Sequence, residues 1–233
     1  HKDISQRKQA EQREAHIKNV LLAIRNINQL ITQETDRHQL IEKACRNLTE
    51  TMGYFSAWIA VLDENGRKVK LATSSGLEEK SLGLRHCLEA GDFPRCMRQA
   101  LSRPELIVIE APSVDCPGCP LTQEYADRSA LAQRLAFGRE VYGVVVVSVP
   151  DHLVRDSEEQ GLFSEMAGDL GFALRKIADA EALQESEQRF RGLFENALDG
   201  VALHEMVLDD QGRPIDYIFL QANPAFEKHT GIR

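Results

Sequence analysis

Apolar residues recur at helical spacing near the start of the chain. No glycine or proline occurs from Ser5 to Ile31, and the first part of this stretch is rich in Gln, Glu, Lys and Arg. Alternating steps of four and three residues, typical of a coiled-coil a/d seam, then separate Ile17, Leu21, Ile24, Asn28 and Ile31. The pattern predicts one long helix that pairs with a second copy through this seam, with the polar Asn28 fixing the register. Its stripe is widened for contact with a sheet by Val20, Ile27 and Leu30.

A second helix and a hairpin are expected next. Asp36 is a suitable N-cap and Gly53 a suitable stop. The apolar positions between them fall on one side of a helix: Leu40, Ile41, Ala44, Leu48 and Met52. The period then changes, because Tyr54–Leu62 is aromatic and β-branched and is followed by an Asp-Glu-Asn-Gly turn. Lys68–Ser74 is the expected returning strand, so the sheet begins here.

The middle of the chain has mixed character. We expect a short helix at Pro94–Leu101 and a brief strand at Leu106–Glu110. Pro112–Leu121 holds three prolines, a glycine and two cysteines, which predicts a constrained loop without regular structure. Ala130–Ala136 and Glu140–Val149 then form a second hairpin, and the second of these strands is apolar enough to be central in a sheet.

The last third of the chain starts with a long helix from Asp156 to about Glu187, whose acidic beginning suits a helix N-terminus. Beyond Ile177 its surface becomes polar, which is typical of a connector with little core of its own. Two strands, Val201–Leu208 and Tyr217–Leu220, follow around a turn. We expect the chain to end before this last domain is complete.

Composition narrows the classes of function. A net charge of −8 argues against nucleic acid as a partner, because binding to its backbone depends on Lys and Arg. No apolar run approaches the roughly 20 residues that cross a bilayer, so no membrane contact is expected in this fragment. Five cysteines with uneven spacing indicate a reducing, cytoplasmic compartment: Cys45, Cys87, Cys96, Cys116 and Cys119.

The order of helix, helix, hairpin, irregular middle, hairpin and long final helix resembles the GAF family. Leu135–Val145, with Tyr142-Gly143-Val144 at its centre, is similar to the closing hairpin of that family, and Glu158–Ala167 is similar to the acidic start of its last helix. The resemblance implies an α+β fold with a GAF-like antiparallel sheet and helices on its faces. Independently, Gly143 in a central strand predicts a close approach of backbone or ligand.

The tail of the chain resembles the PAS family more sharply. Ser186–Ala197 followed by Asp199–Val201 is similar to the start of a PAS domain, and Ala222–Phe226 with Thr230-Gly231 is similar to its second strand and first short helix. The physical chemistry agrees, because Asn223 can cap a helix that has proline at its first position, and the glycine can end that helix.

These resemblances predict three parts: an N-terminal signalling helix (1–16), a GAF-like sensor domain (17–182), and a connector helix with a truncated PAS domain (183–233). They imply a bacterial signalling protein, such as a sensor histidine kinase of a two-component system or a cyclase-type enzyme, whose output domain lies elsewhere. The chain itself is expected not to be an enzyme, because it has no Gly-rich phosphate loop, His-Glu-x-x-His motif or serine nucleophile elbow.

The sharpest candidate for chemistry is Cys116-Pro117-Gly118-Cys119-Pro120. Two cysteines at this spacing can hold a metal ion or an iron–sulfur cluster, with further ligands from Cys87, Cys96 or His86. The same spacing can instead give a reversible redox pair. The GAF resemblance adds a third alternative, since some GAF domains of sensor kinases hold haem or a bilin through a cysteine in this region. In the last alternative the motif only packs a compact turn.

The function expected from these features is signal sensing. A small-molecule ligand, metal, cofactor or redox change in the middle region would alter the packing of the long helices of a homodimer, which pass the signal to the output domain. The competing hypothesis is a dimerisation and spacer module without a ligand. The single tryptophan, Trp58, is expected to pack in the core of the first strand.

Overall fold

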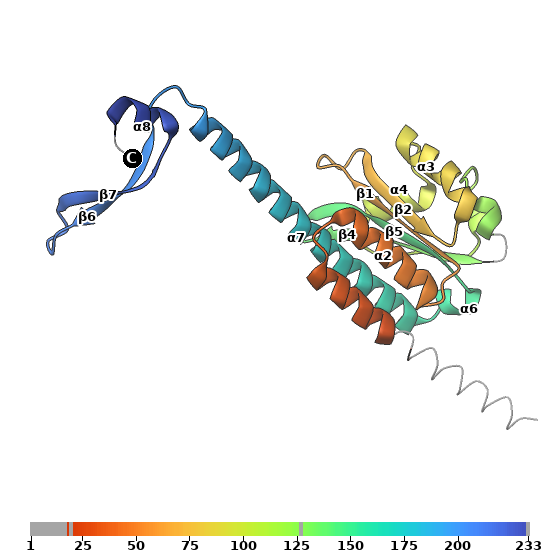
Figure 1. The fold of residues 1–233 in the computed structure, drawn as a ribbon. Helices are drawn as coiled ribbons and strands as arrows, with labels where there is room; N and C mark the ends of the chain where they lie inside the picture. The colour runs from red at the N-terminus through yellow and green to blue at the C-terminus, as the bar shows by residue number, and fades with distance from the viewer. Residues whose placement is uncertain (1–17, 19–20, 126–127, 232–233) are drawn as a thin grey trace, which may run out of the picture. The chain divides into compact units, whose positions relative to one another are not determined.

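The structure is a computed structural model that describes residues 18, 21–125 and 128–231. The chain forms two units, residues 1–177 and 178–233. In the first unit a five-stranded antiparallel sheet lies between two layers of helices (Figure 1). The predicted α+β class is therefore confirmed.

The sheet has the strand order β2-β1-β5-β4-β3, so the apolar strand β5 is central, as predicted. At Gly143 a Cβ atom would lie only 2.2 Å from the carbonyl oxygen of Ala60, which explains the glycine there by close approach of the backbone of β1. The strands are β1 (Ser56–Leu62), β2 (Val69–Ser75), β3 (Ile107–Ile109), β4 (Ser129–Phe137) and β5 (Glu140–Val149).

Both faces of the central strands are buried. Strand side chains alternate between the faces, so β1 directs Ile59 into one core and Trp58 into the other. Trp58 is 1% exposed, which confirms its predicted core position. The two cores lie on opposite faces of the same strands. A displacement of a strand therefore changes the packing of side chains in both cores.

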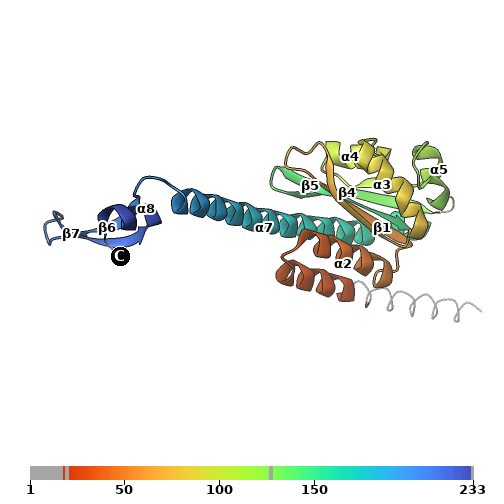
Figure 2. The same cartoon turned by 45° about the horizontal axis from the view of Figure 1, so that its top comes forward.

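One face of the sheet is covered by a helix over residues 21–33, by α2 (Arg37–Glu50) and by α7 (Ser157–Glu195), with α6 (Asp151–Val154) just before α7 (Figure 2). The predicted N-cap is confirmed, because the Asp36 carboxylate accepts a hydrogen bond from the Gln39 N–H at 2.8 Å. The described part of the first helix packs through Ala23 and Ile27, which are buried.

Two buried polar contacts fix this helical layer. The Tyr54 hydroxyl donates to Glu159 Oε1 at 2.5 Å in the first turn of α7, and burial together with this carboxylate raises the pKa of Tyr54. The Asn47 amide of α2 donates to the Ala23 carbonyl at 3.1 Å, and its oxygen accepts from Asn26 at 2.9 Å. Each buried polar group is thus paired across two elements.

The opposite face carries α3 (Ser81–Ala90), α4 (Arg95–Ser102), α5 (Pro112–Asp115) and two 3-10 turns (Glu78–Lys80 and Thr122–Tyr125). The short helix expected at Pro94–Leu101 is confirmed as α4, whereas α3 was not predicted. The expectation that Pro112–Leu121 lacks regular structure is wrong for its first four residues, because Pro112 takes the first helical position, where its missing N–H costs nothing.

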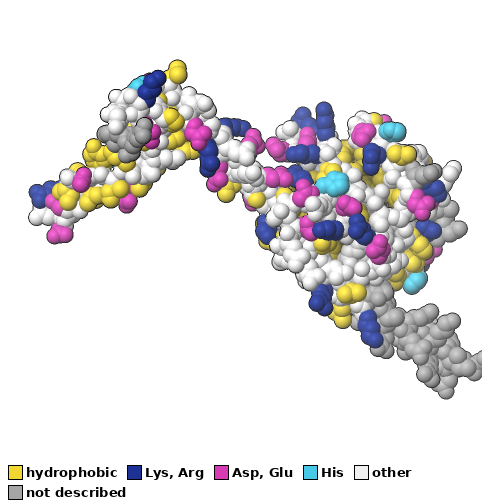
Figure 3. Space-filling view, in the orientation of Figure 1, with side chains coloured by type: hydrophobic (Ala, Val, Ile, Leu, Met, Phe, Trp, Pro, Cys, Tyr) yellow, Lys and Arg dark blue, Asp and Glu magenta, His cyan; other side chains and the backbone are white. Residues whose placement is uncertain are grey.

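The second unit contains the end of α7, a hairpin of β6 (Ala202–Leu208) and β7 (Pro214–Ala222), and α8 (Pro224–Thr230). Helix α7 continues eight residues past the expected end at Glu187. Asn223 caps α8 and Gly231 ends it with a φ of 75°, as predicted. Apolar side chains lie exposed along the hairpin (Figure 3), among them Leu203, Met206, Tyr217, Ile218 and Leu220.

Candidate functional site

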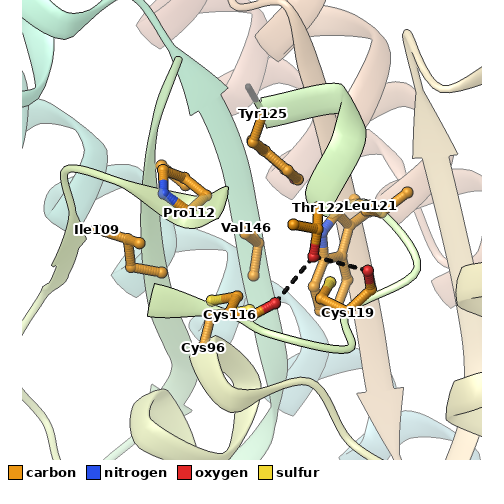
Figure 4. A pocket seen from close by; sticks show the side chains of 11 residues that line it. Cys96, Ile109, Pro112, Cys116, Cys119, Leu121, Thr122, Tyr125 and Val146 are labelled. Carbon is orange, nitrogen blue, oxygen red and sulfur yellow. Dashed lines mark hydrogen bonds between the residues drawn. The ribbon is translucent and has the colours of Figure 1, made fainter. Parts of the chain in front are cut away.

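A small apolar cavity lies between the sheet and the segment that follows α5 (Figure 4). Its volume is about 20 Å³, which is room for one water-sized group. We call it the thiol-lined cavity, after Cys96, Cys116 and Cys119 in its wall. The other residues that line it are Trp58, Ile109, Pro112, Leu121, Thr122, Tyr125, Ala130 and Val146.

The Cys-Pro-Gly-Cys segment is a tight turn at the end of α5. The Cys119 N–H donates to the Cys116 carbonyl at 3.2 Å, and Gly118 takes a φ of 79° that other residues rarely adopt. The Thr122 hydroxyl lies 2.8 Å from the carbonyl oxygens of both cysteines. The turn is therefore fixed by its backbone, with the sulfur atoms free to face other groups.

The pKa of the Cys116 thiol is affected most by Cys96 of α4, and not by Cys119. The Cys96 thiol donates a hydrogen bond towards Cys116, its backbone N–H does the same, and the Arg95 guanidinium lies nearby. Outweighing burial and the Asp115 carboxylate, these groups lower the pKa of Cys116 to about 7. Cys116 is thus the thiol of this cavity that forms a thiolate most readily.

The other thiols are held in the protonated form. The hydrogen bond to Cys116 and burial raise the pKa of Cys96, and burial raises the pKa of Cys119. Burial and Asp92 raise the pKa of Cys87, whose thiol donates to the Asp92 carbonyl. Cys45 lies in the other core with a raised pKa, again from burial.

Three of the predicted metal ligands, Cys96, Cys116 and Cys119, lie together in the wall of the thiol-lined cavity. Among the described residues, no group of three or more His, Cys, Asp or Glu side chains is arranged to hold a metal ion. His86 is exposed on α3, away from the wall of the thiol-lined cavity. Haem or a bilin needs a pocket of roughly 300 Å³ or more, so neither fits a cavity of about 20 Å³.

Tyr125 adds a polar group that the sequence did not single out. Its side chain is 5% exposed, and among the described residues its hydroxyl has no hydrogen-bond partner within bonding geometry. Ser56 and Trp58 lie near enough to lower its pKa, but burial dominates and raises it, so the hydroxyl keeps its proton. The hydroxyl oxygen itself is buried, and the accessible lining of the cavity is almost entirely apolar.

The predicted dimer seam is only partly accessible. Leu21 is 62% exposed and Asn28 is exposed, while Ile24 and Ile31 are half-buried against the core. Ile17 lies outside the described residues. Pairing through this seam stays a prediction.

Solved structures share the architecture of the first unit. The GAF domain of A. aeolicus nlh2 in an inactive state has a TM-score of 0.52 and 15% identity, over 71% of this chain and 99% of that one. The first unit has a GAF-like fold. A GAF domain/HD domain protein from Geobacter sulfurreducens has a TM-score of 0.52 and 17% identity, over 65% and 97% of the chains.

The GAF-like fold also occurs in an enzyme. The free methionine-R-sulfoxide reductase from Neisseria meningitidis, in complex with its substrate, has a TM-score of 0.50 and 17% identity, over 69% of this chain and 93% of that one. At such identities the likeness establishes the fold and not the activity.

Sequence comparison adds one match and one absence. A family profile described as a PAS domain matches residues 188–233. No curated protein matches the chain significantly. Within the described residues, no helix is at once long and apolar enough to cross a membrane.

Proposed function

We propose that this chain is a sensory input module of a multidomain bacterial signalling protein. Its input acts at the thiol-lined cavity, and α7 carries the response towards the PAS-like segment and an output domain beyond it. The parent is a histidine kinase or a cyclase-type signalling enzyme, and the chain itself has no catalytic role. All five cysteines are unpaired, which supports a reducing, cytoplasmic location.

The observation that carries this proposal is that the cavity and α7 lie on opposite faces of the same strands. In β4, Ala130 lines the cavity, while the next residue, Leu131, belongs to the core that contains α7. In β5, Val146 and Val147 are divided in the same way. A change that displaces these strands at the cavity therefore changes the packing of α7.

Helix α7 is built to transmit such a change. Its buried residues end at Ile177, but the helix continues to Glu195 and so spans both units of the chain. No proline interrupts the backbone hydrogen bonds of α7. A shift at its buried half is therefore passed along its axis.

Hydrogen exchange on the full chain distinguishes the sensor proposal from the spacer hypothesis. In a Cys96→Ser variant, which lacks the neighbouring thiol that could displace the label, methyl methanethiosulfonate would transfer a small methylthio group to the Cys116 sulfur as a mixed disulfide, with methanesulfinate as the leaving group. We expect a several-fold change in amide exchange in α7 on the far face of the sheet. The same treatment of a Cys116→Ser variant should leave α7 unchanged. If mass spectrometry shows that Cys116 is fully labelled and the exchange of α7 is unaltered, the spacer hypothesis is favoured.

We further propose that the module is a parallel homodimer through the seam of the first helix. Leucine in place of Asn28 should tighten association by about tenfold, because a polar residue at an a position costs stability. Gln29→Leu, one residue off the seam, should have no effect. A wild-type monomer by light scattering at high micromolar concentration, unchanged by Asn28→Leu, would refute the dimer.

An enzymatic role as a sulfoxide reductase is the alternative that the shared fold raises, and the thiol neighbours Cys96 and Cys116 favour it. A cavity of about 20 Å³ does not admit a substrate of amino-acid size. We therefore expect no turnover of free methionine-R-sulfoxide by the reduced chain. Consumption of this substrate, followed by nuclear magnetic resonance, would reverse that conclusion.

A further inference from the structure

We propose that Cys116 and Cys96 are a peroxide-responsive thiol pair, in which Cys116 is oxidised by hydrogen peroxide and Cys96 then closes a disulfide with it. The inference names the input of the proposed sensor and rests on that function. It also replaces the pairing of Cys116 with Cys119 that their spacing in the sequence favoured.

The Cys116 sulfur lies beside the first turn of α4, and this position favours its oxidation by peroxide. The N-cap of α4 is Pro94, which makes no side-chain hydrogen bond to the first turn. The N–H groups of this turn therefore need an acceptor from elsewhere. The Cys116 sulfur supplies one for Cys96 N–H, and the partial positive charge of the helix N-terminus favours the thiolate.

Two side chains strengthen this arrangement. The Arg95 guanidinium donates to the Asp115 carbonyl at 2.8 Å, which holds its positive charge next to Cys116. Interaction with the Cys96 thiol is the main cause that lowers the pKa of Cys116. Among the described residues, the charged and titratable groups around that sulfur are Arg95, Cys96, Asp115, Cys119 and Tyr125.

Two thiols could resolve the oxidised Cys116, those of Cys96 and Cys119. We assign this role to Cys96 because its side chain lies beside that of Cys116. Figure 4 shows the side chains of Cys96 and Cys116 next to each other, in the wall of the same cavity. Cys119 is instead joined to Cys116 through backbone atoms of the tight turn. A disulfide needs the two side chains to approach each other, and among the described cysteines Cys96 is the one whose thiol interacts most strongly with that of Cys116.

The size of the cavity selects the oxidant. Cys116 is 7% exposed, and the space beside it holds one water-sized group. Hydrogen peroxide is little larger than water, whereas alkyl hydroperoxides and sulfoxides are several times larger.

The chemistry balances without a further reagent. The Cys116 thiolate attacks one peroxide oxygen, the O–O bond breaks, and the departing hydroxide takes a proton and leaves as water, so that Cys116 becomes a sulfenic acid. The Cys96 sulfur then attacks the Cys116 sulfur. An S–S bond forms, the S–O bond breaks, and the proton of Cys96 leaves with the hydroxyl as a second water.

Peptide mapping by mass spectrometry tests the pair on the reduced full chain treated with one equivalent of hydrogen peroxide. We expect a Cys96–Cys116 disulfide in the wild type and in the matched control Cys119→Ser. Cys96→Ser should stop at the sulfenic acid on Cys116, which dimedone traps. A Cys116–Cys119 disulfide, or oxidation of Cys116 no faster than that of Cys45, would overturn the proposal.

The pH dependence of the wild-type rate is a test that needs no variant. Only the thiolate reacts, so the rate should rise as the pH increases through about 7 and level off above it, because the pKa of Cys116 is about 7. In Arg95→Gln the same curve should move to higher pH. A rate that is still rising at pH 9 would contradict the assignment of Cys116 as the reactive thiol.

The outcomes for this pair and for the sensor function are separable. A Cys96–Cys116 disulfide without any change in α7 exchange would leave the thiol chemistry standing and refute transmission. A response of α7 to the methylthio label on Cys116 without a disulfide under peroxide would refute the thiol pair and leave the sensor with another input.

Discussion

Asn223→Ala should abolish most of the protection from hydrogen exchange in residues 196–231 while leaving the first unit intact. Asn223 is the one fully buried side chain among the described residues of the second unit. Its oxygen accepts from the N–H groups of Val201 at 2.8 Å and Phe226 at 2.9 Å. Its amide donates to the carbonyls of Phe194 at 3.1 Å and Asp199 at 2.9 Å.

The expected effect is large because this unit has little apolar core to compensate. Four hydrogen bonds at about 1 kcal/mol each, less some recovery by water, give a loss of about 3 kcal/mol in local stability. That corresponds to more than a hundredfold in the exchange rates of amides that open locally.

Two variants sharpen this test. Asn196→Ala removes an exposed asparagine that makes one local hydrogen bond, to the Gly192 carbonyl, and should leave exchange nearly unchanged. Asn223→Asp keeps the acceptor for Val201 and Phe226 but places an oxygen against two carbonyls, so its effect should be intermediate. Full protection in Asn223→Ala would show that the exposed hairpin is held by other contacts.

Gly171→Ala should destabilise the first unit by about 2 kcal/mol, although alanine is the better helix former. Gly171 lies in α7 where the helix meets β4, and a Cβ atom there would lie 2.5 Å from the Ala136 oxygen and 2.6 Å from its nitrogen. Both are backbone atoms of a strand and cannot move aside cheaply. The helix would have to lift away from the sheet.

Urea denaturation followed by the fluorescence of Trp58 measures this effect, because Trp58 is the single tryptophan and lies in the first unit. Gly168→Ala is the matched control one turn earlier in α7. Its Cβ meets nothing within 4 Å, so it should stabilise the unit by about 0.5 to 1 kcal/mol. Equal stability of Gly171→Ala and Gly168→Ala would rule out the close contact of α7 with β4.

Gly171 also bears on function. If α7 transmits the signal through its contact with the sheet, Gly171→Ala should alter the exchange of α7 even in the absence of any thiol modification. The same change would then reduce the further response to the methylthio label on Cys116, because the helix is already displaced. The response in Gly168→Ala should equal that of the wild type.

Local signals in the sequence were sufficient to predict a helix or strand where the stabilising interactions lie within that element. Asp36 and Asn223 were recognised as N-caps because the bond they make closes within three residues. The central position of β5 followed from a strand that is apolar on both faces. Helix α3 was missed because it buries few residues, Leu84 and Leu88, and carries a glycine that reduces its helical propensity.

Contacts between residues that are far apart in the sequence could not be predicted from such local signals. The spacing of the first helix marked Leu21 and Asn28 as a seam, while the structure buries Ala23 and Ile27, because the fold and not the helix decides which face meets α2. In the cavity, the adjacent Arg95-Cys96 would have suggested a thiolate at Cys96, whereas the structure places the Arg95 charge beside Cys116 and raises the pKa of Cys96. Nothing local marked Tyr125.

The sequence by itself determined the α+β order of elements, the caps, the two-sided burial of the central strand and the presence of a reactive-looking cysteine turn. These features depend on backbone hydrogen bonding and side-chain periodicity within a few residues. Only the tertiary structure decided that Cys116 meets Cys96 instead of Cys119. Twenty residues separate that pair, and the contact arises because α4 and the end of α5 pack on the same face of the sheet, which places a helix N-terminus at the sulfur.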